Sequence, residues 1–386
     1  MTKATVIGTT LVGMLLGNQL ASAATETEWG LPFSAPQPLQ VASGSSGTYY
    51  IDFDGTSGIA YLGRLEPGEN PRRAKFKEMA TPFQASTGND LQIRPSDGAV
   101  FTTDLATRAL ALADLDTHRL TTWTMPPAAD SGPRSIAFDG SGRVLFLSSG
   151  SNVDAVIGRF NASTGLVELW TIPEAIVAPG SDIASRIVQA ADGTVFFNVN
   201  GFAHPALLAR LDLTTGVFTS WVTPGAPIPG LAADGAGAVY FQEQANTLGV
   251  ARFVPATGTL TEWTFVDDIS FTQNMVLQSG RLFFGNNGPV AIVSLDPSVP
   301  GTDSTLSPTI SDPVTPSTSI VRPVVTKRDP HRNDNVRGTL TASSPTARGP
   351  FTVYPTDYPD YIAGDGAGSI YLTGGADGAS IAKLTP

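Results

Sequence analysis

A three-residue motif that ends in tryptophan and occurs five times constrains the fold of this 386-residue chain more than any other feature. Phe76 and Tyr354 stand where the same phrase is expected but tryptophan is missing. With them the series has seven positions, 42 to 51 residues apart except for one interval of 91. Periods of 40–50 residues with several short β runs per unit are typical of propeller blades. The motif reads TEW, TTW, ELW, TSW and TEW, and its tryptophans are Trp29, Trp123, Trp170, Trp221 and Trp263.

Each unit contains four short apolar runs separated by glycine-rich turns. In one unit these runs are RSIAFD, RVLFLSS, AVIGRF and LVELWTIP, over residues 134–173. Such alternation of apolar and polar residues and such turns indicate antiparallel strands joined by hairpins. Seven second strands can be aligned, from TYYIDF to SIYLTG. The sequence therefore predicts an all-β fold, a seven-bladed β-propeller with four-stranded blades.

The two ends of the chain supply complementary parts of one unit. The last unit stops at Pro386 after a third strand, whereas the phrase around Trp29 is a fourth strand with no unit before it. We expect the N-terminal strand to complete the last blade and close the ring, because an open sheet edge promotes aggregation. The chain contains no cysteine, so packing must replace disulfides.

Residues 1–23 have the pattern of an export signal. Lys3 precedes an apolar run, and Ala21-Ser22-Ala23 is a small-residue cleavage site. We expect a secreted or periplasmic, monomeric protein whose propeller spans 24–386. No other stretch is apolar enough to predict a transmembrane segment. The net charge of −11 argues against a nucleic-acid partner, since phosphate binding requires clustered Lys and Arg.

One unit, the sixth, carries an insertion at residues 298–350. It is rich in Ser, Thr and Pro and then becomes basic, in TKRDPHRNDNVR. We expect a long, mobile loop between a third and a fourth strand, on the bottom face of the ring. A partner-binding arm and a small β insertion are the alternatives.

Several phrases resemble the streptogramin lyase family, typified by virginiamycin B lyase, a seven-bladed propeller. GRFNASTGLVELWTIP, ARFVPATGTLTEW and DGAGAVYFQE carry the resemblance, which extends over residues 25–297 and 349–386. It implies a metal-assisted elimination that opens a cyclic depsipeptide, with Mg²⁺ stabilising the developing charge. Glu243 matches the family's glutamate at the end of a second strand. However, no unit has the family's histidine at the start of a first strand.

The residues expected on the top face come from the starts of first strands and the ends of second strands. We assign catalytic roles to His204 and Glu243, and Glu243 is also the candidate metal ligand, for Mg²⁺ or Ca²⁺; no cofactor is certain. The alternatives without a catalytic role are that His204 is an ordinary loop histidine and that Glu243 is a solvated carboxylate at a strand end. The predicted ligand-binding residues are Asp90, Asp104, Arg134, Asn198, Asn274, Asn286 and Asp360.

Two functions of different classes follow from these residues. The first is a secreted propeller that binds a small molecule, glycan, peptide or envelope component on its top face. The second is a divergent metal-dependent C–O lyase or lactone hydrolase acting on a cyclic depsipeptide or a related ester. A mixed ring of acid, amide and cation is compatible with both.

Overall fold

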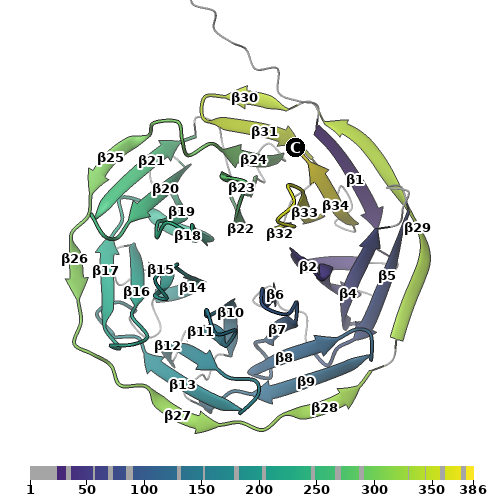
Figure 1. Cartoon of the computed structure of the whole chain (residues 1–386), viewed down its shortest axis with the longest axis horizontal. Helices are drawn as coiled ribbons and strands as arrows, with labels where there is room; N and C mark the ends of the chain where they lie inside the picture. The colour runs from purple at the N-terminus through teal and green to yellow at the C-terminus, as the bar shows by residue number, and fades with distance from the viewer. Residues whose placement is uncertain are drawn as a thin grey trace, which may run out of the picture.

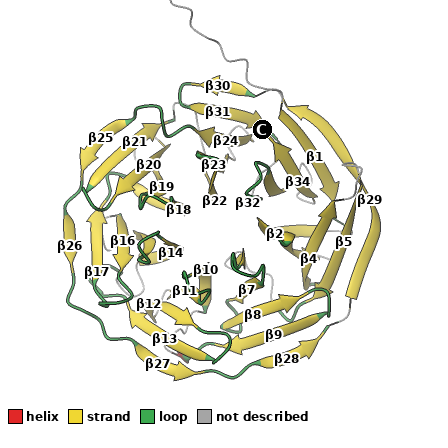
Figure 2. Ribbon diagram, viewed as in Figure 1, coloured by secondary structure: helices red, strands yellow, loops and turns green. Residues whose placement is uncertain are grey.

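The computed structural model shows seven blades around a central channel (Figures 1 and 2). It describes residues 24–31, 36–54, 57–67, 73–83, 90–127, 132–150, 153–177, 182–201, 206–244, 248–265, 271–286, 291–328, 330–343, 345–356, 361–374 and 380–386. The expected export signal lies outside these ranges. Within them, no helix is long and apolar enough to cross a membrane.

Each blade is an antiparallel sheet whose first strand lines the channel and whose fourth strand lies at the rim. Blade 1 contains β2 (Pro36–Gly44), β3 (Gly47–Asp54), β4 (Ile59–Pro67) and β5 (Arg73–Ala80). Blade 2 contains β6 (Leu91–Ile93), β7 (Val100–Asp104), β8 (Ala109–Asp114) and β9 (Arg119–Thr124). Blade 3 contains β10 (Pro133–Phe138), β11 (Val144–Gly150), β12 (Val153–Phe160) and β13 (Leu166–Thr171). Blade 4 contains β14 (Asp182–Gln189), β15 (Val195–Gly201), β16 (Leu207–Leu211) and β17 (Phe218–Val222).

The remaining three blades follow the same plan. Blade 5 contains β18 (Ala226–Ala233), β19 (Val239–Gln244), β20 (Leu248–Val254) and β21 (Thr259–Thr264). Blade 6 contains β22 (Phe271–Gln278), β23 (Arg281–Asn286), β24 (Ala291–Leu295) and β31 (Phe351–Pro355). Blade 7 contains β32 (Tyr361–Gly364), β33 (Ile370–Gly374), β34 (Ser380–Thr385) and β1 (Ala24–Gly30). The N-terminal strand β1 pairs with β34, so the predicted ring closure is confirmed.

The repeated aromatic position is buried between neighbouring blades. Trp221, for example, lies between Phe196 of its own blade and Phe253 of the next, with ring centroids 6.3 and 4.9 Å away. Strand register corrects one member of the series. Met79 pairs with Leu62 in the way that Trp263 pairs with Val250, so blade 1 carries methionine at this position. Phe76, which we had placed in the series, lies three residues earlier and is fully buried.

The expectation of a mobile loop for the insertion is wrong. Residues 302–348 form a belt that runs around the outside of the ring and adds a fifth strand to five blades (Figure 1). Its strand β29 also pairs with both β5 and β1, and so joins blades 1 and 7 into one nine-stranded sheet. The belt strands are β25 (Thr302–Thr305), β26 (Pro308–Ile310), β27 (Ser317–Ile320), β28 (Val324–Lys327), β29 (Pro330–Ser343) and β30 (Thr346–Arg348).

The belt is attached to blades 5, 4, 3 and 2 by a contact that repeats. Between its strands, one belt N–H donates to the carbonyl of the turn before each fourth strand, at 2.8 to 2.9 Å. The first three of these belt residues are apolar and half-buried against the cores between blades. A proline follows each donor two residues later. The four donors are Leu306, Val314, Val321 and Arg328, and their acceptors are Gly258, Gly216, Gly165 and His118.

Candidate functional site at the channel mouth

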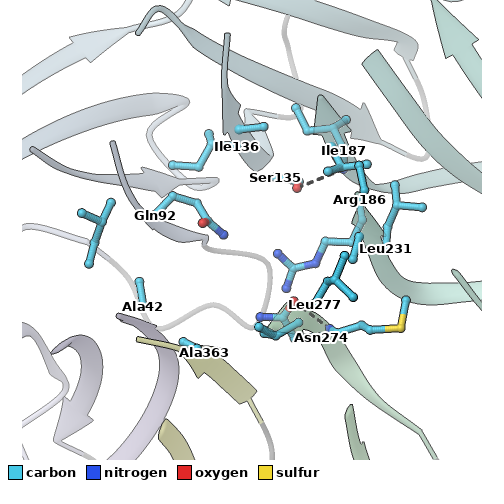
Figure 3. Close-up of a pocket in the computed structure, with 18 of the residues that line it drawn as sticks. Ala42, Gln92, Ser135, Ile136, Arg186, Ile187, Leu231, Asn274, Leu277 and Ala363 are labelled. Atoms are coloured by element: carbon cyan, nitrogen blue, oxygen red, sulfur yellow. Dashed lines mark hydrogen bonds between the residues drawn. The ribbon is translucent and has the colours of Figure 1, made fainter. Parts of the chain in front are cut away.

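The first strands of all seven blades surround a channel with a volume of about 430 Å³ (Figure 3). That volume is in the range of small-molecule sites. One equivalent position in each first strand contributes a side chain to the wall, and in six blades this residue is the small alanine or valine. The seventh blade has Gln92 instead. The six small residues are Ala42, Ala137, Val188, Ala232, Val276 and Ala363.

Polar side chains at the start of the first strands tie neighbouring blades together around the mouth. The Asp90 carboxylate accepts from the Ile136 N–H at 2.9 Å, and the Ser135 hydroxyl accepts from the Ile187 N–H at 3.2 Å. On the opposite side of the ring, the Asn274 amide donates to the Ile362 carbonyl at 2.9 Å. These bonds fix the positions of the first strands relative to one another.

Irregular strand pairing at the same level turns two polar side chains, those of Arg186 and Asn274, toward the channel. The register between first and second strands shifts between Ala184 and Ile187 in blade 4, and between Phe271 and Met275 in blade 6. A β-bulge bends the strand and redirects the side chain of the extra residue. Arg186 and Asn274 lie in these shifts, and Figure 3 shows both directed into the space that Gln92 faces.

Arg186 and Asp90 form an ion pair across blades 4 and 2. The Arg186 Nη1 lies 3.1 Å from the Asp90 Oδ1, with side chains 11% and 1% exposed. Asp90 also accepts from the backbone N–H groups of Leu91 and Ile136 and, at 3.4 Å, from the Gln92 Nε2. These donors hold the Asp90 carboxylate in place, and the carboxylate in turn holds the guanidinium at the mouth through a charge-assisted contact.

Glu243 lies elsewhere, inside blade 5. Its side chain is 4% exposed and is not part of the channel wall. Gly249 lies beside it, and a Cβ built there would be in ordinary van der Waals contact with the Glu243 carboxyl, at 3.8 Å. Burial, followed by the hydrogen bond and charge of Glu262, raises the pKa of Glu243 to about 8. Glu243 is therefore a buried acid that is largely neutral at pH 7.

The other predicted site residues differ in their surroundings. Asp104 is fully buried and caps the turn that follows β7, accepting from Ala106 N–H and Thr107 Oγ1. Asn198 is fully buried and accepts from the Arg186 N–H at 3.0 Å, so it supports the mouth from the second layer. Burial lowers the pKa of the half-buried Arg134 guanidinium, and its Nε has no partner in the described ranges.

Three predicted residues cannot be placed. His204 and Asp360 lie outside the described residues, as does the side chain of Asn286. Across the described ranges, no group of three His, Asp or Glu side chains is arranged to hold a metal ion. The structure thus brings Asp90, Asn274 and the supporting Asn198 to the channel mouth, and separates Glu243 from them.

Two residues of the mouth were missed from the sequence, Arg186 and Gln92. A signal for Gln92 was present, because it is the one polar residue at a position that is alanine or valine in every other unit. Arg186 carried no such signal. Its orientation depends on the irregular pairing of β14, which apolar periodicity does not reveal.

The fold and the channel define a seven-bladed β-propeller with a ligand-sized central cavity. Among solved structures, it is similar to a streptogramin B lyase, with a TM-score of 0.61 and 18% identity over 94% of this chain and 97% of that one. It also matches an auxiliary nutrient-binding protein from Bacteroides ovatus, with a TM-score of 0.44 and 10% identity over 91% of this chain and 97% of that one. No family model and no curated protein matches the sequence. At such identities the likeness to the lyase supports the fold alone.

Proposed function

We propose that the protein is an exported, monomeric binding propeller that holds a small molecule, or the end of a glycan or peptide, at the mouth of its central channel. The observation that carries this proposal is the convergence of Arg186, Gln92 and Asn274 from three blades above a wall of small side chains. A cavity into which a few polar side chains converge is the usual form of a ligand site.

The acid that matches the lyase family is separate from this cavity, which favours binding over catalysis. Glu243 is enclosed beside Glu262, where a substrate in the channel would not reach it. A general acid or base must lie within hydrogen-bond distance of the proton that it transfers. The channel therefore supports recognition without that carboxyl.

Filling the channel tests the proposal. Ala137→Phe places a ring in the wall, while Ala236→Phe adds one to an exposed hairpin turn as the control. A panel of glycans, short peptides and small metabolites is screened by thermal melting, because a ligand of the native state raises the melting temperature. We expect at least one compound to stabilise the wild type and the control but not Ala137→Phe. A panel without such a compound contradicts the proposal.

A divergent metal-dependent lyase or lactone hydrolase is the second candidate, and one observation favours it. With its pKa raised to about 8, Glu243 is a protonated acid at neutral pH, as general acids often are. Melting with and without millimolar Mg²⁺ or Ca²⁺, on wild type and Glu243→Ala, separates the two functions. A metal-dependent rise in melting temperature that Glu243→Ala abolishes would favour the enzyme. We expect no rise in either protein.

A further inference from the structure

We infer that the ligand of the channel mouth carries a carboxylate on an apolar body. This inference rests on the proposed binding function and names the chemical class that the mouth selects. Arg186 is its central residue, because it presents a guanidinium at the top of a cavity whose wall is otherwise mostly uncharged.

The guanidinium is held in place but not saturated. Within the described ranges its side chain makes one interaction, the ion pair from Nη1 to Asp90. Asp90 is fixed in turn by two backbone N–H groups and by Gln92, so it anchors the guanidinium from one side. An arginine has five N–H donors in a planar fork that matches a carboxylate. The donors that do not face Asp90 remain for a ligand, and Figure 3 shows the group pointing into the cavity.

The amides around the guanidinium complete an anion-binding group. The Asn274 Nδ2 and Oδ1 are both engaged with backbone, which orients this side chain toward the mouth. The Gln92 Nε2 donates to Asp90 at the long distance of 3.4 Å and could turn toward a stronger acceptor.

The charge balance of the mouth favours a single negative charge. The Arg186–Asp90 pair has no net charge, so a bound anion is attracted by the guanidinium it contacts and repelled by the more distant Asp90 carboxylate. A phosphate dianion would bring twice the charge to within reach of the same buried carboxylate. A carboxylate therefore suits this site better than a phosphate does.

The wall below the mouth selects the rest of the ligand. The small alanine and valine side chains have no hydrogen-bonding groups, so they favour an aliphatic group over a hydroxyl placed directly against them, while Ser43 and Gln189 line other parts of the channel. An aliphatic group loses nothing and removes apolar surface from water. A short branched aliphatic acid, or the C-terminus of a peptide that ends in an aliphatic residue, has both features.

The test compares two probes that differ in one group, N-acetyl-leucine and N-acetyl-leucinamide. Isothermal titration of the full chain at neutral pH should show binding of the acid and at least tenfold weaker binding of the amide. Arg186→Gln should weaken the acid at least tenfold and leave the amide unchanged. The matched control is Arg143→Gln, which removes another arginine from an Asp–Arg pair, at a hairpin turn, and should bind the acid as the wild type does.

Ala137→Phe provides a second variant that leaves Asp90 and Arg186 intact and should abolish binding of the acid. Equal binding of acid and amide would overturn the inference, and so would failure of both probes to bind at millimolar concentration. A neutral sugar that binds the wild type but not Ala137→Phe would also overturn it, while leaving the proposed binding function in place. Compounds that bind wild type and Ala137→Phe equally would contradict both.

Discussion

Replacing Gly165 with alanine should loosen the belt at blade 3. Gly165 has φ of +74°, and a Cβ built on it would lie 2.1 Å from the Val321 carbonyl oxygen, far inside van der Waals contact. The same glycine accepts a hydrogen bond from the Val321 N–H at 2.9 Å. The added methyl group must therefore push the belt away from the turn and stretch or break this bond.

The magnitude separates into two parts. An L side chain in the left-handed region costs about 1–2 kcal/mol, wherever the position is. Displacing the belt adds the loss of one backbone hydrogen bond, about 1 kcal/mol, and part of the burial of Val321, for about 1 kcal/mol more. We expect Gly165→Ala to lower the free energy of unfolding by about 3–4 kcal/mol.

Gly193→Ala is the matched control. Gly193 has φ of +85° in a hairpin turn, and a Cβ there meets nothing within 4 Å. Gly193→Ala should therefore lower the free energy of unfolding only by the cost of the left-handed conformation, about 1–2 kcal/mol. Denaturant unfolding gives both free energies, and hydrogen exchange of the belt peptide 317–323 gives the local effect, which should be faster exchange in Gly165→Ala alone. Equal destabilisation of the two variants, with unchanged belt exchange, would refute the reasoning.

Two further predictions concern Glu243 and β1. Because the pKa of Glu243 is raised from 4.5 to about 8 on folding, its stabilising contribution is complete below pH 4.5 and is lost as pH rises through 8. Relative to Glu243→Gln, the wild type should thus lose up to about 4 kcal/mol between pH 4.5 and 8.5 in denaturant unfolding; parallel profiles would contradict this. Deleting residues 24–30 removes β1 and the buried Trp29, worth roughly 4–6 kcal/mol as an upper estimate, and should cause aggregation on expression. A truncated protein that melts like the wild type would exclude ring closure by β1 as a source of stability.

The fold could be predicted because each blade repeats the same short sequence patterns. The tryptophan motif, the glycine-rich turns and the second-strand pattern depend on neighbouring residues along the chain, and these are visible in one sequence. Phe76 was assigned wrongly because only the strand register distinguishes it from Met79, three residues later.

The belt could not be predicted by the same means. Its Ser, Thr and Pro residues have almost no apolar pattern, since its strands obtain hydrogen bonds from blade edges made elsewhere in the chain. A weak signal existed in LSP, VTP and VRP, an apolar residue two before proline at intervals of seven or eight residues. It becomes interpretable only once the neighbouring rim is known.

For a related reason, only part of the candidate site could be predicted from the sequence. The sequence predicts that the starts of the first strands form the mouth, and Asp90 and Asn274 lie at that level, bonded to the neighbouring blades. Which side chains turn into the cavity depends on bulges such as the one at Arg186, and these are a property of pairing between strands. The resemblance to the lyase family directed attention to Glu243, whose carboxyl the fold encloses.

The belt leaves blade 6 after β24, passes around the ring and returns to the same blade at β31, so every boundary between blades lies beneath it or beside its ends. A propeller normally has one weak point, the place where its two termini meet. Here circular permutants opened between blades 3 and 4, or between blades 2 and 3, would retain a belt segment that crosses the cut and is paired with the blades on both sides of it. The chain should accept new termini at several positions with similar losses of stability, as a covalently cyclised ring would.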